Sequence, residues 1–254
     1  MVLQVLDTNQ RRVRWAAAAD GSASGGLGSG DRPRWTVSSA LVALGAVIFG
    51  SLLIGSAIFA LFVAGGVDSD TVSDSAGFTL TATFAQELLF VGAAIFTAAQ
   101  FARPTPAQFG FRSFPLSALG WTAGAFAAYL GASAIYGSLI DIPTEDLPFA
   151  NDPSTLLAVV IGIFVIGIAP PVEEFFFRGF LYQALRGRFG VVLGAVASGL
   201  IFGVIHLEAV EQMGILAILG VILALLFERT GTLWPCIFVH TVNNAFAFQY
   251  VMTH

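Results

Sequence analysis

The chain has 254 residues, of which 56% are hydrophobic and 11% are charged, and its formal net charge is −5. Soluble domains are about half apolar and about a quarter charged, so this composition excludes an ordinary soluble domain. The single cysteine, Cys236, excludes an intrachain disulfide and a cysteine-based metal cluster.

Residues 1–37 form a polar segment ahead of the first apolar run. They carry several arginines and a stretch rich in Gly, Ser and Ala from Gly21 to Gly30. The first apolar run begins near Ser38, which is too late for a cleaved signal peptide, and the run is also too long for one. We therefore expect a disordered cytoplasmic tail over residues 1–37 and a helical membrane bundle over residues 38–254.

Helices that cross a bilayer need about 20 mostly apolar residues. On this measure the sequence predicts an all-α, polytopic transmembrane bundle of seven spans, with six or eight as alternatives. The fifth and sixth segments are short, and we expect Pro170-Pro171 to break the fourth. The expected spans are residues 38–65, 78–102, 115–140, 154–182, 190–206, 213–228 and 233–251.

The charges between these spans alternate in sign along the chain. Arginine precedes span one and follows spans two, four and six: Arg103, Arg112, Arg186, Arg188 and Arg229. The other connections contain only acidic residues: Asp68, Asp70, Asp74, Asp141, Glu145, Asp146, Asp152, Glu208 and Glu211. Under the positive-inside rule, this pattern predicts a multi-pass protein of the cell membrane with a cytoplasmic N-terminus and an external C-terminus.

Polar residues inside the predicted spans are the strongest indication of function. A charged side chain at the bilayer centre costs about 2.5–3.5 kcal/mol on insertion scales, so its presence indicates a functional role. Spans four, five and seven contain such polar residues: Glu173, Glu174, Arg178, His206, His240 and Asn244. We therefore examined whether these residues share one depth.

The helical rise of about 1.5 Å per residue gives that depth. Counted from the cytoplasmic ends of their spans, Glu173 lies roughly 20 Å deep and His206 roughly 24 Å deep. His240 and Asn244 lie roughly 14 and 20 Å deep, so three helices are predicted to form one shared site. Glu87 in span two projects to the same layer, at roughly 22 Å, and we interpret it as packing or cavity lining in preference to catalysis.

Spacing also predicts pairs of side chains. Glu174 and Arg178 are four residues apart and can form an ion pair on one helix face. Glu173 points about 100° away from that face and is left free for chemistry. Glu228-Arg229, at the end of span six, is interpreted as an interfacial pair.

Two features favour a compact, water-containing cavity beside Glu173. Pro170-Pro171 frees backbone carbonyls of the preceding turn, and in lipid these must be satisfied by protein or water. Span five presents small residues at intervals of four, which permits close contact between helices: Gly190, Gly194 and Ser198, and also Gly199 and Gly203.

These residue types suit water-mediated hydrolysis of an amide. Glu173 and His206 can hold a water and take its proton, and His240 and Asn244 can donate to the oxyanion of a tetrahedral intermediate. Glu173, His206 and His240 can alternatively hold Zn²⁺. Because the chain has no HExxH pair and Asn is a poor zinc ligand, we expect a mechanism that requires no cofactor, with zinc as the alternative.

In these motifs the sequence resembles the CPBP family, which includes the CAAX prenyl endoproteases and bacterial self-immunity proteins. The resemblance covers about residues 154–250, and three motifs in the same order make it specific. Glu173-Glu174-xxx-Arg178 is similar to the family's EExxxR motif, Phe202-xxx-His206 to its FxxxH motif, and His240 with Asn244 to its final motif.

The resemblance implies a role for each of these residues. Glu173 and His206 would activate water, His240 and Asn244 would stabilise the oxyanion, and Glu174, Arg178 and Phe202 would shape the site. The implied activity is intramembrane endopeptidase cleavage of membrane-associated substrates, with prenylated CAAX-type proteins as one candidate class. The family has been described both with and without a catalytic metal. The expected partners are the lipid bilayer and a membrane-bound peptide or protein, and no nucleic acid.

Two other functions are compatible with buried Glu, His and Arg residues. The first is a non-catalytic binding or immunity protein of the same fold, although the intact motif residues argue against a degenerate site. The second is a proton-coupled transporter, which would also use such residues. A transporter of this kind should show repeated halves with discontinuous helices, and the sequence shows no internal repeat.

Overall fold

The computed structural model describes residues 33–73, 75–140, 155–206 and 210–253. Their regular structure is entirely helical, which confirms the predicted all-α bundle. The separate helices are α2 (Val37–Ala64), α3 (Ala76–Ala99), α4 (Ala118–Leu139), α8 (Val191–Val204), α9 (Met213–Thr230) and α10 (Trp234–Thr253). A composite helix contains α5 (Thr155–Gly162), η2 (Ile163–Ile168), α6 (Ala169–Phe176), η3 (Phe177–Tyr182) and α7 (Gln183–Phe189).

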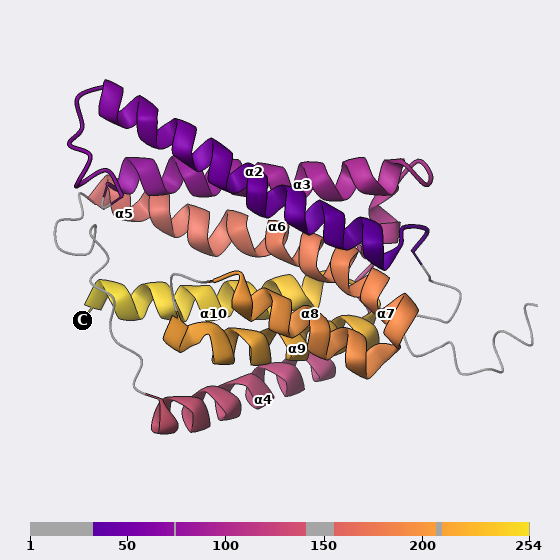
Figure 1. The fold of residues 1–254 in the computed structure, drawn as a ribbon. Coiled ribbons are helices and arrows are strands. Elements are labelled where there is room, and N and C mark those ends of the chain that lie inside the picture. Colours follow the sequence, from indigo (N-terminus) through magenta and orange to yellow (C-terminus); the bar gives the residue numbers. More distant parts are fainter. Residues whose placement is uncertain (1–32, 74, 141–154, 207–209, 254) are drawn as a thin grey trace, which may run out of the picture.

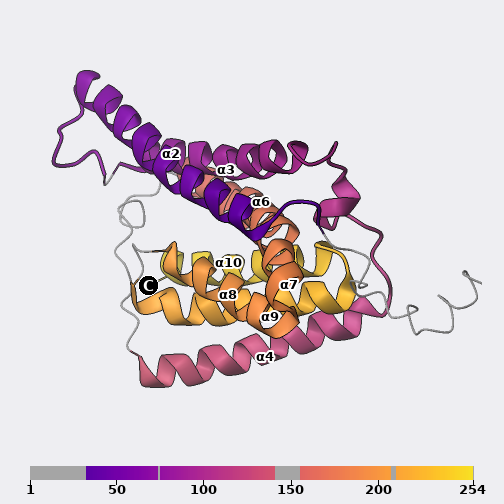
Figure 2. The same ribbon diagram turned by 45° about the vertical axis from the view of Figure 1, so that its right-hand side comes forward.

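The composite helix lies in the middle of the bundle. In Figure 1, α2 and α3 lie on one side of it, and α8, α9 and α10 lie on the other, with α4 outermost. Figure 2 shows the same order from a second direction. The helix α6 packs against both α3 and α10, so its side chains can meet residues from both halves of the bundle.

Short polar signals determine where several helices begin and end. Thr36 forms a capping box with Ser39 at the start of α2, which satisfies backbone N–H groups that have no partner within the helix. The chain reverses between α7 and α8 at the single residue Gly190, where φ is 79°. Glycine adopts this left-handed region without the steric cost of a Cβ, so it allows the tight connection between α7 and α8.

Close contact between α8 and α9 confirms the role predicted for the small residues of span five. A Cβ atom added to Gly199 would lie 2.7 Å from the carbonyl oxygen of Ala217, and one added to Gly220 would lie 2.6 Å from the Cα of Gly199. Such distances leave no room for a side chain, so the two helix backbones are in direct contact.

The fourth predicted span is not broken at Pro170-Pro171. The helix instead runs without interruption from Leu156 to Phe189. The π-helical segment η2 directly precedes the prolines, and the Ala169 N–H bonds to the Phe164 carbonyl, five residues back. This wider turn accommodates two residues that cannot donate backbone hydrogen bonds, so the helix continues through them.

Among the described residues, five helices are long and apolar enough to cross a membrane, which makes this a multi-pass membrane protein. They are α2, α3, α4, the segment Leu156–Phe189 and the segment Val210–Thr230. The helix α8 is apolar but shorter, and α10 carries the polar His240 and Asn244 motif. The count of seven spans stays a prediction.

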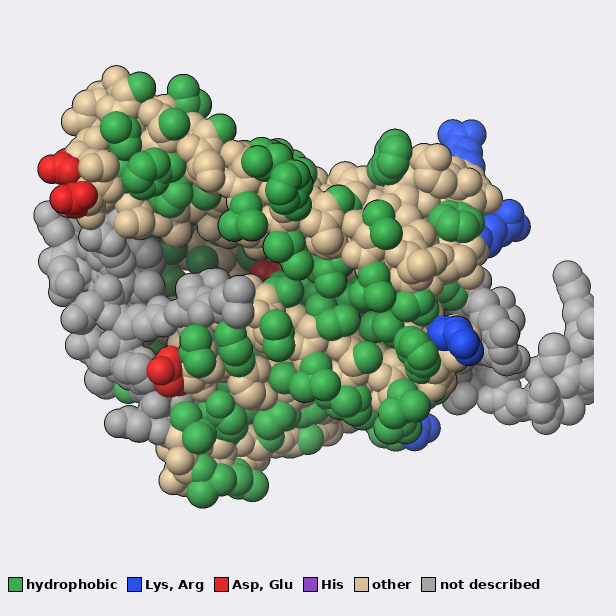
Figure 3. Space-filling view, in the orientation of Figure 1, with side chains coloured by type: hydrophobic (Ala, Val, Ile, Leu, Met, Phe, Trp, Pro, Cys, Tyr) green, Lys and Arg blue, Asp and Glu red, His purple; other side chains and the backbone are tan. Residues whose placement is uncertain are grey.

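Charged side chains gather at opposite ends of the bundle. Figure 3 shows arginines at one end and acidic residues at the other. The exposed arginines are Arg34, Arg103, Arg188 and Arg229, and the exposed acidic residues are Asp68, Asp70 and Glu211. The positive-inside rule predicts that the arginine-bearing end faces the cytoplasm, and this orientation stays a prediction.

Some of the sequence-based expectations concern residues that lie outside the described part of the chain. Residues 1–32 of the expected tail lie outside the described residues, as do Asp74, Asp141, Glu145, Asp146, Asp152 and Glu208. The end of the expected tail is not disordered. Trp35 is buried, its indole N–H donates to the Phe180 carbonyl at 3.0 Å, and its ring stacks on Phe109.

The predicted pair of Glu228 with Arg229 is wrong. Glu228 instead accepts hydrogen bonds from Arg186 at 2.5 and 2.7 Å and from the Tyr182 hydroxyl at 3.0 Å. Arg229 lies over the ring of Trp121, with its guanidinium carbon 5.1 Å from the ring centroid. Adjacent residues on a helix point in different directions, so each finds its partner on another element.

Topology can be tested with reporter fusions. Fusions after Thr71 and after His254 should both report an external position, and a fusion after Arg103 should report the cytoplasm, because arginine-rich connections remain inside. Alkaline phosphatase and green fluorescent protein activities in cells measure the two locations. A cytoplasmic signal after His254 would contradict the odd number of spans.

Candidate active site

The site is centred on the turn of α6 that carries Glu173 and Glu174. A π-helical segment lies on each side of this turn, η2 before it and η3 after it. Such segments are rare and occur often at functional sites, because a wider turn leaves backbone groups free for other partners. No spacing rule revealed either segment, although Pro170-Pro171 marked the position of the first.

Asn244 on α10 is bonded to the backbone that the prolines leave free. A π-helical turn would join the Val165 carbonyl to residue 170, but Pro170 has no N–H group. The Asn244 side-chain amide donates to this carbonyl at 3.0 Å, so protein satisfies a carbonyl freed by the prolines, as predicted. The amide nitrogen carries a second hydrogen, so Asn244 retains donor capacity.

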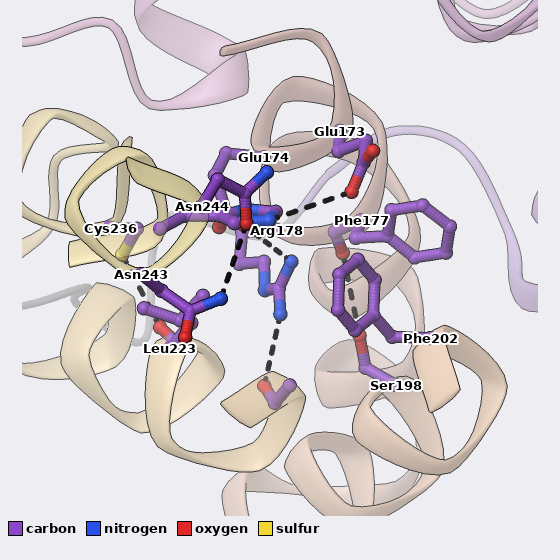
Figure 4. A network of polar contacts seen from close by, with 12 residues as sticks. Glu173, Glu174, Phe177, Arg178, Ser198, Phe202, Leu223, Cys236, Asn243 and Asn244 are labelled. Atoms are coloured by element: carbon purple, nitrogen blue, oxygen red, sulfur yellow. Dashed lines mark hydrogen bonds and ion pairs between the residues drawn. The ribbon is translucent and has the colours of Figure 1, made fainter. Parts of the chain in front are cut away.

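Glu174 and Arg178 form the predicted ion pair, and both side chains are fully buried (Figure 4). The Arg178 guanidinium donates to Glu174 Oε1 at 2.6 Å and to the Gly220 carbonyl at 3.4 Å. Its guanidinium carbon also lies 4.6 Å from the centroid of the Phe202 ring. A buried charge is strongly destabilising without a partner, so this pair is a structural requirement of the site.

His240 lies between the two adjacent glutamates. Its Nδ1 is 2.8 Å from Glu174 Oε1, and its Nε2 is 3.8 Å from Glu173 Oε2. An ionised carboxylate only accepts hydrogen bonds, so the proton of the shorter contact belongs to Nδ1. Glu174 therefore holds the imidazole in one orientation, with Nε2 directed at Glu173. Sequence reasoning missed this contact between α6 and α10.

His206, just after α8, is held in a similar way. Its Nδ1 lies 2.8 Å from the Phe202 carbonyl, which can only accept, so Nε2 is the atom available for chemistry. The Phe202 ring meets both imidazoles edge-on, with centroid distances of 5.0 Å to His206 and 5.7 Å to His240. Phe202 thus lies between the two histidines and contacts both rings.

The two glutamates differ in their access to water and substrate. The Glu174 side chain is fully buried, whereas the Glu173 side chain is 14% exposed. Of the two, only Glu173 can therefore meet another molecule. One oxygen of each carboxylate, Oε2, is buried without a hydrogen bond among the described residues.

The structure brings together six of the seven predicted site residues in one chain of contacts: Glu173, Glu174, Arg178, Phe202, His206 and His240. Asn244 lies one helical turn beyond His240 and contacts η2. Within the described residues, no three His, Cys, Asp or Glu side chains lie close enough to hold a metal ion.

Comparison with known proteins finds similarity in the segment of the chain that contains this site. Residues 153–246 match the family model described as type II CAAX prenyl endopeptidase Rce1-like. A Bacillus subtilis (strain 168) protein named "Putative membrane peptidase YdiL" is 31% identical over 90 residues, which are 35% of this chain and 36% of that protein. The alignment thus spans about a third of each protein. No solved structure matches the chain.

The segment that matches the family model contains every residue of the contact chain described above, from Glu173 on α6 to His240 on α10. We refer to residues 153–246, which are similar to that family, as the Rce1-like domain.

Proposed function

We propose that the protein is a membrane endopeptidase that hydrolyses peptide bonds of membrane-associated substrates with a water activated by Glu173. The observation that carries the proposal is the position of His240, which Glu174 orients so that Nε2 faces the partly exposed Glu173. A carboxylate that orients an imidazole toward a second reactive group is a recurrent device in hydrolases.

In the first step Glu173 acts as general base. Its carboxylate takes a proton from water as the water oxygen bonds to the carbonyl carbon of the substrate. His206 Nε2 presents a lone pair, because Nδ1 holds the hydrogen donated to the Phe202 carbonyl, and it is the second acceptor for the same water. When the carbon–nitrogen bond breaks, Glu173 returns the proton to the leaving nitrogen, which gives a carboxylic acid and an amine.

The oxyanion formed in the first step needs hydrogen-bond donors. His240 supplies one when it carries a proton on Nε2 in addition to the Nδ1 proton held by Glu174. The second N–H of the Asn244 amide supplies another. Arg178 pairs with Glu174, and Glu174 in turn holds the imidazole of His240 in place. This mechanism uses no metal.

Prenylated CAAX-type proteins are one substrate class within this proposal. A direct assay reconstitutes the full chain in lipid nanodiscs with a prenylated CAAX peptide, its unprenylated counterpart and an unrelated single-span peptide. Mass spectrometry then identifies the products. We expect a new C-terminus in at least one membrane-associated peptide, and none with Glu173→Gln. Intact peptides throughout would instead support a non-catalytic binding or immunity protein.

Chelation separates the water mechanism from the zinc alternative. We expect turnover to persist after incubation with 1,10-phenanthroline, because the described residues contain no three-ligand metal set. The measurement is the cleavage rate before and after treatment, with a zinc protease as the positive control. Complete loss of activity that added Zn²⁺ restores would contradict the roles given to His206 and His240.

A further inference from the structure

A third glutamate lies beside the site, on a helix outside the segment that matches the family. Glu87 is on α3, is 3% exposed, and its Oε2 atom is buried without a hydrogen bond among the described residues. A buried polar group without a partner costs free energy, so its presence in an otherwise apolar helix needs an explanation. Glu87 has no part in the mechanism above.

The helices packed against α3 limit which ionisable groups can lie near Glu87. The helix α3 packs against α2 and α6. Neither α2 nor the composite helix from Thr155 to Val172 contains an ionisable side chain. Phe84 and Phe90 lie three residues before and after Glu87 on the same face of α3, and their rings contact Phe164 and Phe176 at centroid distances of 6.4 and 4.7 Å. Glu87 therefore faces the part of the composite helix between these two rings, which includes Glu173. The Glu173 Oε2 atom is likewise buried without a hydrogen bond.

The basic side chains of the site contact groups other than Glu87. Arg178 bonds to Glu174, and His240 lies between Glu174 and Glu173, so neither reaches Glu87 in the contacts of the described residues. Two ionised carboxylates close together in a low-dielectric interior repel each other. A single proton on one of them removes the repulsion and also supplies the donor that both unpartnered oxygens lack, as in other carboxyl pairs.

The side chain that keeps this proton can be assigned from exposure. Glu173 is the more exposed of the two, because its side chain is 14% exposed, and it has His240 Nε2 at 3.8 Å. Glu87 has no donor in the described contacts and is almost completely buried. Burial of the neutral form of Glu87 therefore costs less free energy than burial of its ionised form.

We propose that Glu87 is a positioning residue that remains protonated and donates its carboxylic O–H to the Glu173 carboxylate. This bond fixes the orientation of Glu173 toward the water it activates, so the inference rests on the proposed function of Glu173. The active site would then be completed by α3, from the part of the chain that precedes the Rce1-like domain.

Infrared spectroscopy tests the protonated state without any substrate. The difference spectrum of wild type minus Glu87→Gln, in nanodiscs at neutral pH, should contain the carbonyl stretch of a protonated carboxylic acid. This band should shift to lower frequency in D₂O. The absence of a carboxylic-acid band would overturn the proposal, whatever the outcome of the peptidase assays.

Kinetics test the positioning role. Glu87→Gln keeps a neutral donor of the same shape, so we expect kcat within a few-fold of wild type. Glu87→Leu removes the donor and should lower kcat roughly 10²-fold with little change in KM, because a misplaced catalytic group costs about that much. Gln86→Leu, on the same turn of α3, is the matched control and should leave kcat unchanged.

Each kinetic outcome either supports or overturns the positioning role of Glu87. Thermal unfolding is recorded for every variant, so that a lower kcat in Glu87→Leu can be distinguished from a loss of folded protein. Wild-type kcat in Glu87→Leu would overturn the positioning role. Equal losses of kcat in Glu87→Gln and Glu87→Leu would also overturn it. They would show that a neutral hydrogen-bond donor at this position does not maintain kcat. Failure of wild type to cleave any peptide would count against the proposed function, and the infrared result would still test Glu87.

Discussion

Replacement of Glu173 by Gln is expected to lower kcat by about 10²–10⁴, the contribution typical of a general base. The amide has the shape of the carboxylate but cannot take a proton from water at neutral pH. The substrate should still bind, because the change removes neither volume nor the helix packing around α6. The measurements are single-turnover cleavage in nanodiscs and the binding of a fluorescent substrate peptide.

The control for this variant is Glu228→Gln, which alters a glutamate paired with Arg186 at the other end of the composite helix. We expect it to retain turnover, since Glu228 bonds to Arg186 and Tyr182 and takes no part in the contacts that join the motif residues. Turnover by Glu173→Gln at the wild-type rate would eliminate Glu173 as the general base.

Replacement of Arg178 by Ala is expected to destabilise the fold by about 3–5 kcal/mol, because it leaves the charge of Glu174 buried without its cation. His240 still contacts Glu174 Oε1, so the loss should fall near the lower end of that range. The same change removes the contact with the Phe202 ring and the bond to the Gly220 carbonyl. Denaturant unfolding in mixed micelles measures the difference.

A double variant separates the effect on folding from the effect on chemistry. Glu174→Leu combined with Arg178→Leu removes both buried charges, and such replacements are often neutral or stabilising. We expect this variant to recover stability but not turnover, because His240 would lose the carboxylate that orients it. Full activity in the double variant would show that Glu174 has no part in catalysis.

Local sequence rules predicted the contacts that occur within one helix. The interval between Glu174 and Arg178 was sufficient to predict their ion pair, since residues four apart share a helix face. Counting the helical rise placed Glu173, His206 and His240 in one layer, and the structure joins them through direct contacts or the ring of Phe202.

Contacts between helices were not predictable in the same way. Glu174 and His240 are 66 residues apart, and no spacing rule states which face of α10 meets α6. The error over Glu228 has the same origin, because its partner Arg186 comes from another helix. The proline pair was misread as a break because a π-helical turn, which has no clear sequence signal, can carry a helix through such a site.

The central claim is that Glu173 and His240 act as one unit in one step, Glu173 on the water and His240 on the oxyanion. The most direct test is a double-mutant cycle on single-turnover cleavage, with Glu173→Gln, His240→Ala and the combined variant. His240→Ala alone should cost about 10²–10³ in rate. Residues that act as a unit are not additive, so the combined variant should be little slower than Glu173→Gln alone. If the rate loss of the combined variant equals the product of the two single losses, the claim is contradicted, because the two residues would then contribute independently.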